Sequence, residues 1–347
     1  MHHLPDDLTI KNQPISRTAV IWRKFRAQKL ALVSLCLFVL ILIVSLCAPL
    51  IANDKPLYVH YQGKHLLPML QAYPETRFGG DFETPTNYHD PAVLKLIRQN
   101  GDVWMPLIKY GEQTLVLDAQ MPHPAAPSFA HPLGTDQVGR DVLARLLYAL
   151  RISLIFGIGL SLIGSIFGVL AGLLMGYFGG LTDLFGQRLI EIWIGLPQLF
   201  VMIILASIFE PSLTVLFLLL LSFGWLSLVS LTRVHFLQSR RLDYVLTAQN
   251  LGVPAWVIIY RHILPSTFLL VLSQLPFVMV ANISALTTLD FLGLGLPMGS
   301  ASLGELLAQG KNHLDAPHLV LSGFVALAVV LSLLIFIGEG LRNALDR

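Results

Sequence analysis

The stretch DYVLTAQNLGVPAWVIIYRHILP, residues 243–265, decides how this chain is interpreted. Uncharged apolar runs at 211–232 and 267–289 flank it, and each is long enough to cross a lipid bilayer. The stretch itself is amphipathic and is interrupted by Gly252 and Pro254. It is therefore expected outside the lipid, and the question is what its apolar side chains pack against.

The composition of the chain is that of an integral membrane protein. Of its 347 residues 54% are hydrophobic and 13% are charged, whereas a soluble domain carries about 25% charged residues. A helix needs about 20 apolar residues to cross a bilayer, and six uncharged runs approach or exceed that length. They predict an all-α membrane protein with transmembrane helices near 30–52, 152–177, 189–209, 212–232, 267–289 and 317–339.

The first apolar run is expected to remain as a transmembrane helix. It extends from Leu30 to Cys47, which is longer than the core of about 7–15 residues in a signal peptide. Residues 1–29 would then form a cytoplasmic tail. The two cysteines, Cys36 and Cys47, both lie in this run, so the sequence predicts neither a disulfide framework nor a cysteine metal site.

Positive charges near the spans predict the orientation of the chain. Cytoplasmic connections are enriched in Lys and Arg, and long loops do not count in this rule. Basic residues near the spans are concentrated in the tail, in the segment 233–266 and at the C-terminus: Lys11, Arg17, Arg23, Lys24, Arg26, Lys29, Arg233, Arg240, Arg241, Arg261, Arg342 and Arg347. The short connections on the opposite side hold only Lys311. Both termini and the 243–265 stretch are therefore expected in the cytoplasm.

Residues 53–150 form a long insertion after the first predicted helix, on the outer side of the membrane. The insertion is rich in Pro, aromatic and charged residues, and most of it is expected to fold as a small irregular cap. Its last part, DQVGRDVLARLLYAL (136–150), has apolar residues on one helical face. We expect a helix capped by Asp136 that lies in the outer interface of the membrane before the second span.

The second predicted span contains glycines at every fourth position: Gly164, Gly168, Gly172 and Gly176. Such a stripe lets two helix backbones approach closely, which favours helix association in lipid. The stripe predicts packing against another helix of the same chain. The alternative is contact with a second membrane subunit, and the sequence does not separate the two.

The chain lacks the motifs of common enzymes and transport ATPases. It contains no HExxH, CxxC or GxSxG motif, no metal-ligand spacing and no phosphate-binding loop for ATP. Its formal net charge of +2 gives no indication of nucleic-acid binding. Pro197 and Pro276 interrupt two apolar runs, as in some ion-coupled transporters, but no ionisable residue lies in the middle of a run.

The 243–265 stretch is expected to form two short helices. Asp243 could cap the first, on which Tyr244, Ala248 and Leu251 recur at helical spacing. Gly252 would end it in the left-handed conformation, and Pro254 would begin the second. The apolar stripe of the second helix is Trp256, Ile259, Tyr260 and Ile263, and Pro265 precedes the next span. These helices rest on the inner ends of their own spans, dock a cytoplasmic partner, or do both.

The same stretch resembles the cytoplasmic EAA loop of permeases from binding-protein-dependent ABC importers. The resemblance is carried by YVLTAQNLG (244–252) and IIYRHILP (258–265), in which Ala248, Gly252, Leu264 and Pro265 match. Leu246 and Thr247 replace the glutamate and first alanine that give the loop its name. The departure affects polar contacts of that glutamate and leaves the turn unchanged.

Two further stretches resemble the C-type permeases of dipeptide and oligopeptide importers: 131–154 (HPLGTDQVGRDVLARLLYALRISL) and 290–312 (DFLGLGLPMGSASLGELLAQGKN). The long insertion, with ETRFGGDF (75–82) and YHDP (88–91), is similar to that of the permease of the microcin C and oligopeptide importer of Gram-negative bacteria. This resemblance implies the type I importer permease fold, with six transmembrane helices, a permease domain over 148–342 and a coupling loop over 233–266.

The resemblance also implies a bacterial inner-membrane complex. Its other members would be a second permease subunit, two ATP-binding subunits or one fused ATPase, and a periplasmic binding protein that delivers peptide. ATP and Mg²⁺ would bind to the ATPase subunits, and this chain itself would hold no cofactor. The residues that the resemblance places at the ATPase contact are Asp243, Tyr244, Ala248, Gly252, Trp256, Ile259, His262 and Pro265. Residues that contact peptide cannot be named.

Two other function classes stay open at the level of sequence. An ion-coupled secondary transporter would move solute without ATPase partners, and a membrane-embedded hydrolase would need a nucleophile or metal. Neither class accounts for an amphipathic double helix on the cytoplasmic side.

Overall fold

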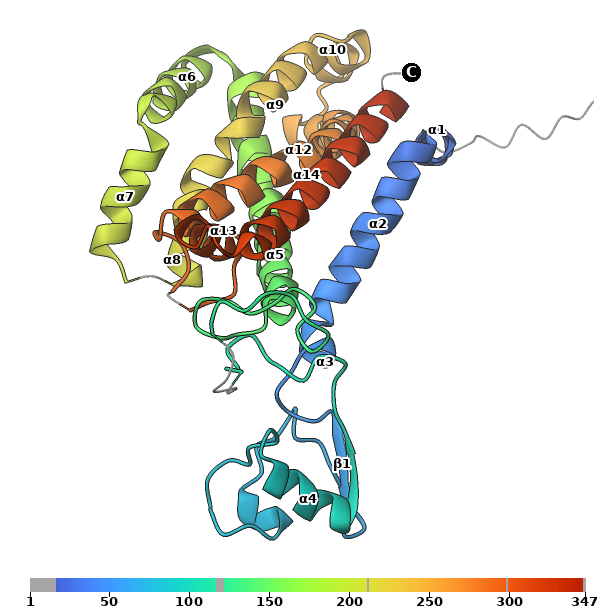
Figure 1. Cartoon of the computed structure of the whole chain (residues 1–347). Coiled ribbons are helices and arrows are strands. Elements are labelled where there is room, and N and C mark those ends of the chain that lie inside the picture. Colours follow the sequence, from blue (N-terminus) through green and yellow to red (C-terminus); the bar gives the residue numbers. More distant parts are fainter. Residues whose placement is uncertain (1–16, 117–121, 211, 298, 346–347) are drawn as a thin grey trace, which may run out of the picture.

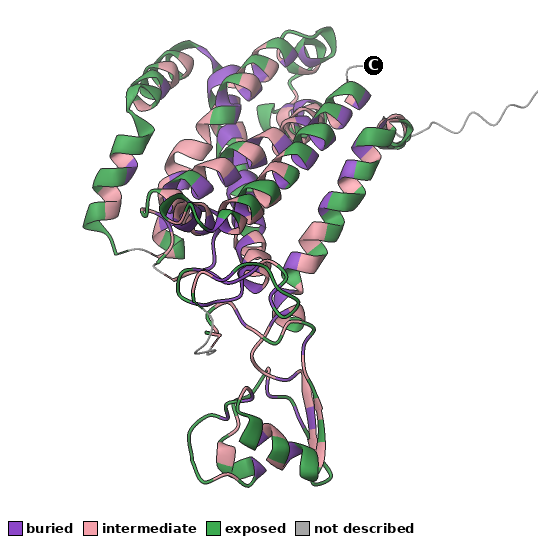
Figure 2. Cartoon of the chain, in the orientation of Figure 1, coloured by how far each residue is buried: buried purple, intermediate pink, exposed green. Residues whose placement is uncertain are grey.

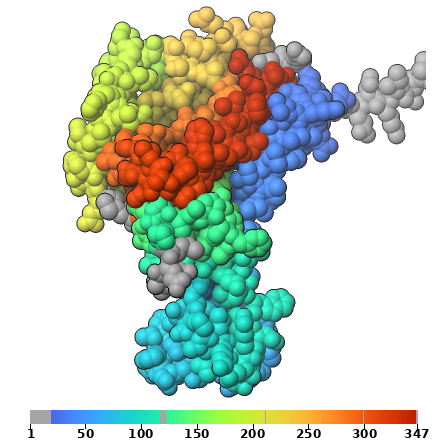
Figure 3. Space-filling view, in the orientation of Figure 1, coloured from blue at the N-terminus to red at the C-terminus, as the bar shows by residue number. Residues whose placement is uncertain are grey.

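The computed structural model describes residues 17–116, 122–210, 212–297 and 299–345. Their helices form a bundle, from one end of which the insertion protrudes as a separate lobe (Figure 1, Figure 3). The beginning of the expected tail, with Lys11, and the C-terminal Arg347 lie outside the described residues. The last part of the tail forms α1 (Arg17–Ala27), which leads into the first span.

Five helical segments of the described chain are long and apolar enough to cross a membrane. They are α2 (Lys29–Leu46), α5 (Val142–Leu173) with the π-helical turn η2 (Leu174–Phe178), α8 (Leu213–Gly224) with α9 (Leu226–Ser239), α11 (Ala255–Ile258) with the π-helical turn η3 (Ile259–Ile263) and α12 (Leu264–Phe291), and α14 (Pro317–Leu345). A sixth is present if the bent pair α6 (Gly180–Gly195) and α7 (Gln198–Ile208) counts as one span.

The third predicted span is not a single helix. Its two halves, α6 and α7, meet at an angle of 75°. Pro197 lies at the break, and Leu196 before it has an extended backbone. Proline cannot donate to the helical ladder and disfavours a helical conformation in the preceding residue. The prediction of one helix over 189–209 is therefore wrong, and both halves are largely exposed (Figure 2).

Two other predicted boundaries also change. The first span ends at Leu46, and a short helix, α3 (Ala48–Ile51), follows with Pro49 in its first turn, where proline is tolerated. The second span begins at Val142 and runs straight into the membrane segment, so the separate interfacial helix over 136–150 is wrong. Its N-cap is Asp141, whose carboxylate accepts a hydrogen bond of 2.8 Å from the Ala144 N–H.

Asp136, the expected cap, belongs instead to a buried group of charges at the N-terminal end of α5. Its carboxylate accepts hydrogen bonds from the backbone N–H and the Nε of Arg140, at 2.8 Å and 2.7 Å. Arg145 is fully buried and pairs with Glu305 on α13 (Leu303–Asn312). It also donates to the carbonyls of Gly299 and Ser300. This buried charge group fastens the start of α5 to the loop before α13.

The insertion folds around its own small core. Its strands β1 (Tyr58–Tyr61), β2 (Lys64–Leu66) and β3 (Gly101–Trp104) form an antiparallel sheet in the order β2-β1-β3. Helix α4 (Pro91–Gln99) and the 3₁₀ turn η1 (Glu75–Phe78) pack on one face of the sheet, where Phe78 is fully buried. The expected irregular cap therefore contains a regular sheet and a helix.

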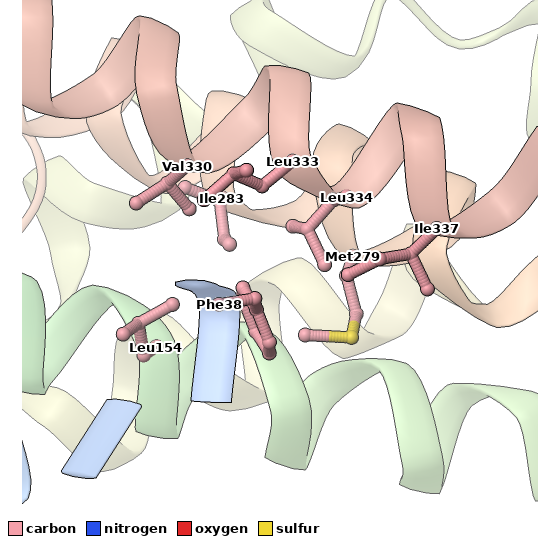
Figure 4. Packing of buried hydrophobic residues seen from close by; sticks show 8 residues of the cluster. All are labelled: Phe38, Leu154, Met279, Ile283, Val330, Leu333, Leu334 and Ile337. Atoms are coloured by element: carbon pink, nitrogen blue, oxygen red, sulfur yellow. The ribbon is translucent and has the colours of Figure 1, made fainter. Parts of the chain in front are cut away.

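The main core of the bundle joins four helices. Figure 4 shows its buried side chains, which come from α2, α5, α12 and α14: Phe38, Leu154, Met279, Ile283, Val330, Leu333, Leu334 and Ile337. Since lipid supplies no hydrophobic drive between helices, this close side-chain packing holds the bundle together. It also fixes α12, the helix that leads out of the 243–265 stretch.

Candidate functional site

The 243–265 stretch lies at the end of the bundle opposite the insertion (Figure 1). Its first helix, α10 (Asp243–Asn250), begins after Leu242, and Asp243 is the first helical residue. No side chain caps this helix, so the prediction that Asp243 caps it is wrong. The Asp243 carboxylate still lies in the first turn, where the helix dipole favours a negative charge.

Gly252 ends α10 with a φ of +76°, as the sequence predicts. The Val253 N–H donates to the Ala248 carbonyl and the Gly252 N–H to the Gln249 carbonyl, both at 3.0 Å. These two hydrogen bonds form a Schellman motif, which satisfies the last carbonyls of a helix and reverses the chain. The turn therefore has one defined geometry.

The second half of the stretch is continuous with the next span. Pro254 precedes α11 as its cap rather than as its first residue, which corrects the prediction. The chain then passes through η3 into α12 without a break, and Pro265 lies in the first turn of α12. Proline removes one N–H donor and displaces the carbonyl four residues earlier, which agrees with a π-helical turn just before Pro265. The segment is thus continuous with α12.

The buried side of the stretch packs on the ends of neighbouring spans. Val245, Ile258 and Ile263 are fully buried and form a cluster with Phe236 of α9. Half-buried residues of α5, η2 and the stretch itself surround the cluster: Val169, Leu173, Tyr177, Ala248, Val253 and Ile259. Part of the amphipathic surface therefore rests on the chain's own helices.

The opposite side of the stretch exposes large aromatic and apolar side chains. Trp256 and Tyr260, one helical turn apart, are each 71% exposed, and Leu251 is 77% exposed. Tyr244 is also exposed, and its ring lies 5.9 Å from that of His262. We call Tyr244, Leu251, Trp256 and Tyr260 the exposed aromatic face. Tyr and Trp are enriched in the centres of protein interfaces, so this face has the chemistry of a docking surface.

Beside the exposed aromatic face runs a groove of about 960 Å³. Tyr244, Tyr260, His262 and Pro265 line part of it. The structure therefore brings six of the eight predicted contact residues to the surface: Asp243, Tyr244, Gly252, Trp256, His262 and Pro265. Ala248 and Ile259 are half-buried toward the chain's own core.

The sequence pattern did not separate the two sides of the second helix. It grouped Trp256, Ile259, Tyr260 and Ile263 into one stripe, but Ile263 is fully buried whereas Trp256 and Tyr260 point outward. A spacing of four residues separates Trp256 from Tyr260, and this spacing alone could have assigned them to one face. Among the described residues, no group of three or more His, Cys, Asp or Glu side chains is arranged to hold a metal ion.

The glycine stripe lies against α9, the helix that leads into the stretch. A Cβ on Gly168 would lie 2.7 Å from the Trp225 carbonyl oxygen, and one on Gly176 would lie 2.4 Å from that of Arg233. Gly172 is equally close to Thr232, and Gly164 is in looser contact with Gly224. The structure places the stripe in an intramolecular contact that positions α9.

We expect Gly172→Leu to destabilise the chain by about 1–3 kcal/mol, the typical cost of overpacking. Its Cβ would lie 2.8 Å from the Arg233 backbone nitrogen, so α5 and α9 would have to separate. The matched control is Gly159→Ala on the same helix, where a Cβ meets only Phe217, at 3.6 Å. Thermal unfolding in detergent measures both, and equal melting temperatures would contradict the close contact.

Comparison with known proteins identifies the family. Residues 168–347, just over half of the chain, match the family described as the inner membrane component of binding-protein-dependent transport systems. The chain belongs to this family. Residues 16–68 match the N-terminal transmembrane domain of oligopeptide transport permease C.

Relatives that are named as permeases agree with this family assignment. The chain is 48% identical over 326 residues to the inner membrane ABC transporter permease protein YejE of Escherichia coli K12, covering 94% of this chain and 95% of the relative. It is 42% identical over 351 residues to the peptidoglycan transport system permease protein YejE of Agrobacterium fabrum, covering 94% and 91%. It is 36% identical over 222 residues to the dipeptide transport system permease protein DppC of Bacillus subtilis, covering 63% and 69%.

Membership of this permease family settles the function class. The chain is a multi-pass inner-membrane protein and a permease subunit of an ABC importer, not an ion-coupled transporter acting alone. Permeases of this family are the non-catalytic membrane subunits, and they work with an ATPase and a substrate-binding protein. A surface where the ATPase docks is therefore required.

Proposed function

We propose that this chain forms, with a second permease subunit, the pathway of a peptide importer, and that the 243–265 stretch transmits the motion of the ATPase. The observation that carries the proposal is that the exposed aromatic face lies on a turn whose other side packs against the ends of the spans. Trp256 and Tyr260 are exposed, while Val245 and Ile258 of the same stretch are buried against the spans. A contact made at this face moves α12 and α9 because the turn cannot yield independently.

The proposed orientation places the stretch and both termini in the cytoplasm and the insertion in the periplasm. The support is the excess of Lys and Arg at one end of the bundle, for example Arg233, Arg240 and Arg261. Two ATPase subunits, or one fused ATPase, would bind ATP and Mg²⁺ below the membrane. A periplasmic protein would deliver substrate to the end that carries the insertion.

The proposed substrates are peptides or peptide conjugates. The support is that several relatives are named as dipeptide or oligopeptide transport permeases, and one as a peptidoglycan transport permease. Short peptides, microcin C-like peptide conjugates and peptides from the cell wall all share an extended backbone with charged groups. The proposal covers this class and assigns no single member.

The test is gentle-detergent purification of the tagged chain from its native membrane, with mass spectrometry of the proteins that accompany it. We expect a second permease and one or two ATPases in a fixed ratio. Reconstitution of this complex with its binding protein should give ATP-driven uptake of peptide. A chain that purifies alone and moves solute without ATP would contradict the proposal.

We expect Gly252→Val to impair the coupling of ATP hydrolysis to uptake. A β-branched residue at a φ of +76° is strained by roughly 1–2 kcal/mol, although no neighbouring atom would obstruct its Cβ. The strain would open the turn between α10 and α11. Gly252→Asn is the matched control, because Asn tolerates the left-handed conformation and should retain coupling. Equal coupling ratios in the two variants would contradict the role of the turn.

A further inference from the structure

A groove lies between α5 and α8 at the end of the bundle that carries the insertion. It has a volume of about 660 Å³, within the range of about 300–1,000 Å³ that is typical of small-molecule sites. Most of its lining is apolar, with Phe156, Phe217 and Leu218 among the larger side chains. The described groove therefore offers room and apolar contact for a short peptide.

Two opposite charges line this apolar groove. Glu112 comes from the insertion and Arg151 from α5, and both are partly buried. Both charges act electrostatically on Tyr148, and Glu112 also acts on the buried Arg145, but no ion pair at contact distance is formed by the Glu112 or the Arg151 side chain with another described residue. The Tyr148 hydroxyl already donates to the Ala52 carbonyl at 3.0 Å. Partly buried charges without a direct hydrogen-bonding partner are costly, so the groove favours an occupant that brings both a cation and an anion.

We infer that this groove is a transit site for the transported peptide, in which Arg151 binds the terminal carboxylate and Glu112 the terminal ammonium. The inference rests on the proposed peptide transport. A short free peptide brings both an ammonium and a carboxylate, and apolar side chains of the peptide would pack on the apolar part of the lining. A purely apolar helix of the second permease would fill the apolar part but would bring no partner for either charge.

Gly159 keeps the groove open on the α5 side. A Cβ at this position meets only the Phe217 ring, at 3.6 Å, which is an ordinary van der Waals contact. A larger side chain is therefore compatible with the helix, and it would occupy the groove. Gly159→Leu is thus a blocking variant that should leave the fold intact.

The test uses the complex that purifies with the chain, reconstituted with its binding protein and ATP. The probe is tritiated trialanine. We expect Arg151→Gln, Glu112→Gln and Gly159→Leu each to lower its uptake about tenfold, the usual effect of losing a charge-assisted hydrogen bond or of blocking a site. Leu162→Phe is the control, because Leu162 is exposed on the same helix but lies outside the groove lining. Thermal unfolding confirms that each variant is folded.

A photo-crosslinking amino acid at Leu218 identifies the occupant directly. Labelling of the chain by tritiated trialanine during turnover, reduced in Arg151→Gln, would support the transit site. Crosslinks to the second permease or to lipid alone would overturn it, as would normal uptake in all three groove variants. In those cases ATP-driven uptake by the unmodified complex still stands. Absence of that uptake would instead contradict the proposed peptide transport itself.

Discussion

Arg145→Met is expected to lose about 3–5 kcal/mol of stability, the usual cost of breaking a buried ion pair. Arg145 is fully buried and lies within ion-pair distance of Asp136 and Glu305. It also donates to the backbone carbonyls of Glu112, Gly299 and Ser300. Methionine fills a similar volume but removes the donor to the Glu112 and Ser300 carbonyls. It also leaves the carboxylates of Asp136 and Glu305 with Arg140 as their one remaining cationic partner among the described residues. Thermal unfolding of the purified chain in detergent measures the loss.

Arg188→Met provides the matched control for this prediction. Arg188 pairs with Glu191 at 2.6 Å, but the two side chains are 68% and 57% exposed. An exposed pair contributes only about 0–1 kcal/mol. We therefore expect Arg188→Met to unfold near the temperature of the unmodified chain. If Arg145→Met unfolds at that same temperature, the buried charge group does not hold this end of the bundle.

This buried charge group shows what the sequence could not predict. Arg145 and Glu305 are 160 residues apart, and no local pattern links them. Asp136 precedes an apolar helical pattern and so has the appearance of a cap, yet its carboxylate is used by Arg140, four residues later. Asp141, the actual cap, stands five residues further along. Which of the two aspartates caps α5 therefore depends on tertiary ion pairs, and local sequence rules do not include these.

The turn at Gly252 was predictable because its cause is local. A glycine after the last residue of an amphipathic helix, followed by proline, indicates a left-handed C-terminal turn. The same reasoning failed at Pro265, because a proline in the first turn of a helix does not separate it from the preceding helix. The chain passes from α11 through η3 into α12 there. The position of the 243–265 stretch was therefore predictable, but its continuity with α12 was not.

The apolar runs predicted the positions of the spans but not their shape. The length of an apolar run indicates whether a segment can cross a bilayer. It gives little information about a bend such as that between α6 and α7. The groove that contains Glu112 and Arg151 was also hidden, because its charges come from the insertion and from α5. The residues that we propose to contact the peptide could not be named from the sequence for the same reason.

Replacing both Trp256 and Tyr260 with alanine is expected to remove the ATPase from the complex. Each ring is 71% exposed, so its removal leaves the fold of this chain unchanged. Buried aromatic anchors at an interface contribute about 2 kcal/mol or more each, and losing two would weaken binding roughly a thousandfold or more. Pull-down of the tagged chain should then recover little ATPase, and ATP-driven uptake should fall in parallel.

Trp104→Ala is the control for the double variant. Trp104 is 66% exposed but belongs to β3 of the insertion, at the opposite end of the molecule (Figure 1). Its loss should leave ATPase recovery unchanged if the exposed aromatic face is the docking surface. If the double variant recovers as much ATPase as Trp104→Ala, the ATPase docks elsewhere. If Trp104→Ala also loses the ATPase, then removing an exposed tryptophan at either end of the molecule disrupts the complex. The loss in the double variant would then not identify the 243–265 stretch as the docking surface.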